Sequence, residues 1–257
     1  MDRPRRRSRP KPHQGRGRPP RQSGSKRQGA AGRQGDGRRG ASPRRDSARG
    51  TISREAAEEI RASAGTRAMK VIRLLEEASD AMARERWPDA QRLAGQAKVL
   101  SPRTGAAREA LGLALYRGGR FPEALRELQA YRRLTGRVDQ NHLIADAHRA
   151  AGDPEKAVPV VQEALRARIP EESRAEAAVV GGAALADMGR FDEALSLLRK
   201  FDRSSDAARP HDLRVWYVMG DVLQRAGRRD EAVDRFRRIL RVDPDAYDVA
   251  ERLAALS

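Results

Sequence analysis

The chain contains no cysteine, which excludes disulfide bridges, thiol nucleophiles and cysteine-ligated metals. It has no apolar run near the roughly 18 residues that a membrane-spanning helix needs. No apolar stretch follows the charged N-terminus, so a secretory signal is not expected. Aromatic residues make up only 4% of the 257 residues. Together these absences favour a cytoplasmic protein.

Residues 1–50 differ in composition from the rest of the chain. They carry 17 Lys and Arg residues against three acids, a net charge of +14 out of +17, and contain no aromatic residue and no Val, Ile or Leu. Such a segment cannot bury enough apolar surface to offset the entropy lost on ordering, so it is predicted to be a disordered basic tail. Arginine outnumbers lysine 47 to 6 in the whole chain, which is typical of a GC-rich bacterial genome.

A short pattern recurs in the rest of the chain. It reads "GRFPEALREL" at 119–128, "GDPEKAVPVV" at 152–161, "GRFDEALSLL" at 189–198 and "GRRDEAVDRF" at 227–236, with "ERWPDAQRLA" at 85–94 as a fifth copy. The aligned alanines are 33 to 38 residues apart: Ala90, Ala124, Ala157, Ala194 and Ala232. A period in this range is typical of a solenoid of small repeated units.

Each unit is predicted to be a hairpin of two helices, as in the second copy, where Gly118-Gly119 ends one helix and Pro122 starts the next. Small residues recur near the middle of each first helix, where two helices would cross closely: Ala78, Gly112, Ala145, Gly182 and Gly220. This pattern resembles the tetratricopeptide repeat, with repeats starting near residues 71, 105, 138, 175 and 213. The resemblance implies an all-α, right-handed α-solenoid of five helical hairpins.

The ends and the irregular spacings give further expectations. Residues 51–70 are predicted to form an N-terminal capping helix (53–64) and a linker, and residues 71–257 the solenoid, closed by a capping helix over 245–256. Extra residues at 172–174 and 209–212 are expected to lengthen two loops. Pro159 lies inside a second helix and is expected to kink it.

No catalytic or metal-binding constellation is present in the sequence. His142 and His148 are six residues apart on one helix and point in different directions, so they cannot share a metal, and His148 is expected to pack in the core. No nucleophile or phosphate-loop motif occurs. The sequence "VVGG" at 179–182 suggests a nucleotide-binding loop, but it is expected to lie within a helix. We therefore expect no metal, no cofactor and no enzymatic activity.

The resemblance implies that the first helices line a concave groove that accepts a protein or peptide partner. The residues that it places there are Glu109, Tyr116, Arg117, Asp139, His142, Asp146, Arg149, Glu176, Asp187, Arg214, Tyr217, Asp221 and Arg225. The Lys and Asn of the family's carboxylate clamp are replaced by Leu75, Ser79, Glu109 and Leu113, which disfavours an acidic chaperone tail as the ligand.

The basic tail suggests a second binding function, contact with a polyanion such as RNA or DNA. Without aromatic residues it would bind phosphates with little sequence preference. Its candidate contacts are Arg5, Arg6, Arg7, Arg16, Arg18, Arg38, Arg39, Arg44 and Arg45. The sequence thus favours a non-enzymatic adaptor with a partner groove. A nonspecific nucleic-acid-binding protein assembled by its repeats, a subunit that positions an enzyme, and a merely solubilising tail remain alternatives.

Overall fold

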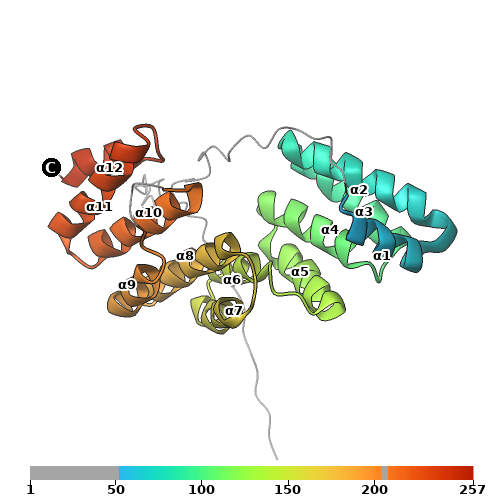
Figure 1. Cartoon of the computed structure of the whole chain (residues 1–257), viewed down its shortest axis with the longest axis horizontal. Coiled ribbons are helices and arrows are strands. Elements are labelled where there is room, and N and C mark those ends of the chain that lie inside the picture. The colour runs from blue at the N-terminus through green and yellow to red at the C-terminus, as the bar shows by residue number, and fades with distance from the viewer. Residues whose placement is uncertain (1–51, 204–207, 257) are drawn as a thin grey trace, which may run out of the picture. The chain divides into compact units, whose positions relative to one another are not determined.

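The computed structural model describes residues 52–203 and 208–256, in which every regular element is helical (Figure 1). The helices are α1 (Arg54–Ala64), α2 (Ala68–Ala83), α3 (Trp87–Leu100), α4 (Gly105–Arg117), α5 (Phe121–Thr135), α6 (Asn141–Ala150), α7 (Pro154–Arg166), α8 (Glu171–Asp187), α9 (Phe191–Arg199), α10 (Pro210–Arg225), α11 (Arg229–Val242) and α12 (Val249–Leu256), with a 3-10 turn at Gly65–Arg67. The tail predicted at 1–50 lies outside the described residues.

The predicted right-handed α-solenoid is confirmed. Five antiparallel hairpins follow one another: α2–α3, α4–α5, α6–α7, α8–α9 and α10–α11. Each second helix packs on the first helix of its own hairpin and on the next helix along the chain. First helices also contact one another directly, α2 with α4, α6 with α8 and α8 with α10, so they form the more tightly spaced layer. We call the exposed side of this first-helix layer the inner face.

A left-handed residue makes the turn within each hairpin. Gly119, Gly152, Gly189 and Gly227 hold φ angles of 75°, 85°, 73° and 75°. Glycine adopts this conformation without the steric cost that a Cβ brings, which explains why it recurs in the motif. In the first repeat the same place is taken by Glu85, with φ 55°, so this turn is made by a residue less suited to it.

The hairpins are held together by close crossings at the small residues. A Cβ built on Gly112 would lie 2.7 Å from Leu128, and one built on Gly220 would lie 2.6 Å from Phe236. The recurrent motif alanines, Ala90 to Ala232, are all fully buried on the second helices. The predicted packing role of both sets of small residues is therefore confirmed.

One of the two loop predictions is wrong, because helix α8 begins at Glu171 and the extra residues at 172–174 lengthen this first helix instead of a loop. Helix α10 begins at Pro210 and takes up residues 210–212, but the connection from Arg199 to Pro210 is longer than the other connections between hairpins, as predicted. At α10 the reason is local: the carboxylate of Asp212 accepts a hydrogen bond of 2.8 Å from the backbone N–H of Arg209, which closes the first turn. Helix α7 continues through Pro159 without ending.

Two further expectations need correction. The C-terminal helix starts at Val249, because Asp243 accepts a hydrogen bond of 3.1 Å from the N–H of Asp245 and Tyr247 adopts φ 53°, which keeps this segment in turns. His148 is only half-buried, so it is not a core residue. The predicted N-terminal helix is confirmed, with the Ser53 hydroxyl accepting from the N–H of Ala56.

The buried apolar side chains of the described residues form three clusters along the array. One cluster of buried side chains runs from α1 to α5, and two others run from α6 to α8 and from α8 to α12. The boundary between the second and third hairpins is bridged by polar contacts, among them Arg132 to Glu163 at 2.8 Å. No helix of the described ranges is long and apolar enough to cross a membrane.

Two mid-helix glycines give a matched test of the crossing geometry. Gly220→Ala pushes a methyl group against the buried Phe236 ring and is expected to lower the free energy of unfolding by about 1–3 kcal/mol. Gly95 has no atom within 4 Å of a Cβ, so Gly95→Ala is expected to raise it by roughly 0.5–1 kcal/mol through helix propensity. Urea unfolding of both variants measures this. Equal effects would refute the repeat register.

Candidate partner-binding face

The structure brings the predicted groove residues together on the inner face. All except Asp139, which precedes α6, lie on the first helices α4, α6, α8 and α10. They form two groups. One lies near the C-terminal ends of these helices and the other, around Glu109, His142 and Glu176, lies nearer their N-terminal ends.

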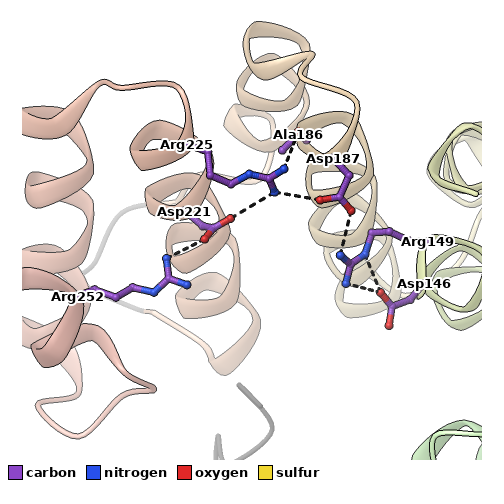
Figure 2. Close-up of polar contacts among 7 residues, drawn as sticks. All are labelled: Asp146, Arg149, Ala186, Asp187, Asp221, Arg225 and Arg252. Atoms are coloured by element: carbon purple, nitrogen blue, oxygen red, sulfur yellow. Dashed lines mark hydrogen bonds and ion pairs between the residues drawn. The ribbon is translucent and has the colours of Figure 1, made fainter. Parts of the chain in front are cut away.

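The first group is a chain of ion pairs that crosses from helix to helix (Figure 2). Arg149 of α6 lies 3.0 Å from Asp146 on its own helix and 3.1 Å from Asp187 of α8. Arg225 of α10 lies 3.0 Å from the other oxygen of Asp187, so this carboxylate joins two guanidinium groups. We call the connected residues the ion-pair ladder: Asp146, Arg149, Asp187, Arg225, Asp221 and Arg252.

The ladder continues into the C-terminal helix α12. Arg252 lies 2.7 Å from Asp221 and 3.2 Å from Asp248, and it lies over the ring of Tyr217 at 5.0 Å from the centroid. The Tyr217 hydroxyl donates a 2.7 Å hydrogen bond to Asp248. These contacts fix α12 against α10.

At the other end the ladder reaches α4, because the hydroxyl of Tyr116 donates a hydrogen bond to Asp146. Burial by itself would lower the pKa of Arg149, but Asp146 and Asp187 outweigh it and raise that pKa. Every acid of the ladder faces an arginine, so this half of the inner face presents paired charges. Its residues therefore serve first to join the repeats.

The second group contains a carboxylate whose direct hydrogen-bond partner is neutral. Glu109 of α4 is half-buried and accepts a 2.7 Å hydrogen bond from the amide of Gln140. Burial raises the pKa of Glu109, the Gln140 hydrogen bond opposes this, and the negative charges of Asp139 and Glu59 raise it further. The remote positive charge of Arg137 only partly offsets these effects. This corner of the inner face therefore holds more acidic than basic groups, with Arg137 beside the three acids Glu109, Asp139 and Glu59.

Asp139 and His142 are held beside Glu109 by their own contacts. Asp139 accepts hydrogen bonds from the Tyr131 hydroxyl at 3.0 Å and from Arg137 at 2.9 Å. The Nδ1 atom of His142 lies 3.0 Å from the Asp139 carbonyl oxygen. Burial lowers the pKa of His142, which favours the neutral ring at physiological pH. The histidine thus orders the loop and adds no charge.

Glu176 and Arg214 link α8 to α10 further along the same group. Their charged groups are 2.9 Å apart, the Glu176 side chain being 14% exposed and the Arg214 side chain 52%. Burial raises the pKa of Glu176, while Arg214 and, more weakly, Arg117 oppose the shift. Arg214 remains accessible, and Arg117 is exposed. The inner face thus offers positive charge here and negative charge at Glu109.

Some contributing residues were missed by the sequence pattern. Asp248 and Arg252 lie beyond the last repeat, where no repeat position marks them. Gln140 precedes its helix and is recognised only through its bond to Glu109. Among residues 52–203 and 208–256, no group of three or more potential ligands is placed to bind a metal ion. The tail arginines at 5–7, 16, 18, 38, 39, 44 and 45 lie outside the described ranges.

Sequence profiles described as tetratricopeptide repeat match residues 75–137, 142–209 and 185–256. The solved structure of YrrB, a TPR protein with an unusual peptide-binding site, is 18% identical with a TM-score of 0.52, covering 77% of this chain and 99% of that one. The thermophilic TPR protein TTC0263 of Thermus thermophilus is 20% identical with a TM-score of 0.58, covering 72% and 97%. Human IFIT1, solved with m7Gppp-AAAA, is 16% identical with a TM-score of 0.54, covering 71% and 44%. No curated protein matches the chain.

The central carboxylate of the ladder can be tested by mutation. Asp187→Asn removes the charge shared by Arg149 and Arg225, and we expect it to lower the free energy of unfolding by about 1–2 kcal/mol. Asp192→Asn, at a side chain that is 99% exposed, is the control and should stay within about 0.5 kcal/mol of the parent. Denaturant unfolding at low and high salt provides the measurement. If Asp187→Asn leaves the free energy of unfolding unchanged, the ladder does not stabilise the array.

Proposed function

The chain belongs to the tetratricopeptide repeat family, and we propose that it is a non-enzymatic adaptor whose inner face docks a segment of a partner protein. Repeats of this family build protein-interaction scaffolds, and the five hairpins here expose a layer of first helices. The thirteen groove residues predicted from the sequence supply the polar groups of this layer. They divide between joining the repeats and contacting the partner.

The ion-pair ladder restricts where the partner lies. Its arginines and aspartates satisfy one another, and a partner that displaced them would have to replace several charge-assisted hydrogen bonds at once. The N-terminal halves of the first helices keep accessible groups, including Arg214 and the corner at Glu109. We therefore place the docked segment along Glu109, His142, Glu176 and Arg214.

The carboxylate of Glu109 is the observation that carries the proposal. It is partly desolvated, its direct hydrogen bond comes from an uncharged amide, and Asp139 and Glu59 add negative potential. A lysine or arginine of a partner would neutralise this charge where water is already partly excluded, so its contribution would exceed that of an exposed pair. The preferred segment accordingly carries a basic residue at this point.

Glu109→Gln should separate binding from stability. We expect the variant to bind Lys- or Arg-containing 15-residue peptides about tenfold more weakly in fluorescence anisotropy, a loss of about 1.4 kcal/mol. Stability should not fall at neutral pH. The folded pKa is raised above the unfolded value, so the ionised carboxylate costs stability as pH rises through the window between the two values, and glutamine removes that cost.

Glu155→Gln, at an exposed residue in the first turn of α7, is the matched control and should bind like the parent. If Glu109→Gln and Glu155→Gln bind basic peptides equally well, the partner does not contact Glu109. If Glu109→Gln unfolds more easily than the parent, its carboxylate is structural and the proposed role is wrong.

We further propose that residues 1–50 hold the assembly near a polyanion, because they concentrate +14 of the chain's net charge of +17. Residues 51–257 carry only +3, so the folded part alone is expected to bind nucleic acid weakly. A protein whose main ligand is RNA or DNA, held through the tail, is the alternative function. Crosslinked proteins that are retained after truncation to 51–257 would favour the adaptor.

Salt dependence measures the contribution of the tail. If about six cations contact phosphates, the logarithm of the affinity for single-stranded nucleic acid should fall with log salt at a slope near −4. Neutral replacement of Arg5, Arg6 and Arg7 should flatten this slope by roughly two, and base sequence should have little influence. Oligonucleotide titrations at several salt concentrations test this. If residues 51–257 alone bind nucleic acid tightly and independently of salt, the nucleic-acid site lies on the repeats and not on the tail.

A further inference from the structure

The outer surface of α3 differs from that of the other second helices. Two positions, five and nine residues after the motif alanine, lie one helical turn apart and share one face on α3, α5, α7 and α11, whereas in the fourth repeat the second position lies beyond the end of α9. In the last four repeats these positions hold long polar side chains: Gln129, Gln162, Arg199 and Arg237 at the first, and Arg133, Arg166, Arg203 and Arg241 at the second. In the first repeat they hold Gly95 and Val99. The first repeat alone lacks polar side chains there.

The packing of the chain itself does not explain either residue. Gly112, Gly181, Gly182 and Gly220 each have a side-chain atom within 2.9 Å of a built Cβ, whereas Gly95 has none within 4 Å. A glycine inside a helix lowers its stability, so Gly95 has a cost without a packing benefit in the described structure. Val99 is 74% exposed, the highest value among the large hydrophobic residues that are exposed.

Gly95 and Val99 line a surface groove between α2 and α3, together with Leu74 and the bases Lys70, Arg92 and Lys98. Lys98 is paired with Glu127 at 2.9 Å and Arg92 lies 3.4 Å from Asp89, so Lys70 and the 58% exposed Arg92 side chain supply the accessible positive charge. The N-terminal helix α1 does not fill it, because α1 packs on α2 and reaches α4, where Glu59 accepts a 2.5 Å hydrogen bond from the N–H of Gly105. We call this region the α3 groove. It has an apolar floor at the start of the solenoid and a basic rim.

The composition of the chain argues against two occupants. Residues 1–50 contain no Val, Ile, Leu or aromatic side chain to fill an apolar floor, and their charge of +14 opposes the basic rim. A second copy docked through the same groove would place Lys70 and Arg92 against their equivalents, which are like charges. An occupant with the opposite character satisfies both constraints.

We propose that the α3 groove docks an amphipathic helix of a partner protein, with an apolar stripe and acidic flanks. Gly95 lets the backbone of the partner helix approach α3 closely, and Val99 and Leu74 contact the apolar stripe. Lys70 and Arg92 face the acidic flanks, which steers the partner and excludes basic helices. This surface is separate from the inner face, so the protein would hold two partners at once.

The test replaces Gly95 and Val99 of α3 with residue types that the other repeats carry at the same two positions. Full-length protein is panned against displayed 18-residue helices with a fixed leucine stripe and randomised flanks. We expect enriched helices to carry Asp and Glu flanks and to lose at least tenfold in affinity for the double variant Gly95→Gln/Val99→Arg. Because no atom lies within 4 Å of a Cβ built on Gly95 and Val99 is 74% exposed, the variant should melt at the same temperature as the parent or higher.

Leu134→Arg, at a 46% exposed residue at the end of α5, is the matched control and should bind the selected helices normally. Helices with basic flanks, or helices that bind the double variant equally well, would overturn the proposal. A dimer in sedimentation that the double variant dissociates would also overturn it, by assigning the groove to a second copy. If basic peptides fail to bind at Glu109 but the selected acidic helices still bind the parent protein, the proposal for the α3 groove stands and only the proposed function of the inner face fails.

Discussion

The close crossing of the two helices in each hairpin is the constraint on which the rest of the structure depends. Where Gly112, Gly182 and Gly220 meet Leu128, Leu198 and Phe236, there is no room for even one additional methyl group. Because these contacts leave so little room, they fix how the two helices of these hairpins pack against each other. The spacing of the inner face, and therefore the distance between charges on neighbouring first helices, follows from these crossings.

That spacing makes the ion-pair ladder possible. Arginine is long enough to reach a carboxylate on the next first helix and has several N–H donors, so Arg149 and Arg225 both reach Asp187. Apolar burial holds a hairpin together and supplies most of the contact between hairpins. Charged pairs then add directional contacts among α6, α8, α10 and α12, while between the second and third hairpins the buried apolar clusters are interrupted and polar bonds such as Arg132 to Glu163 cross the boundary.

The polar residues of the inner face therefore have two different roles. Groove positions in repeat proteins are commonly regarded as ligand contacts, but here several of them are committed to neighbouring helices. What is left for a partner is the group around Glu109, where burial and nearby acids leave negative charge with a neutral direct partner. At the start of the array, Gly95 and Val99 mark a second surface that no helix of the described chain covers.

The sequence by itself determined the all-α class, the repeat register and the turns, because small residues at crossings and glycines with positive φ are local requirements that leave a periodic trace. It also placed the predicted polar residues of the inner face on the first helices, except Asp139, which precedes α6. Only the tertiary structure decided which of them pair, that residues 171–174 and 210–212 extend helices, and that the last helix begins at Val249. The physical reason is distance: Asp187 and Arg225 are 38 residues apart, as are Asp187 and Arg149, and helical periodicity does not specify which charges meet across a helix interface.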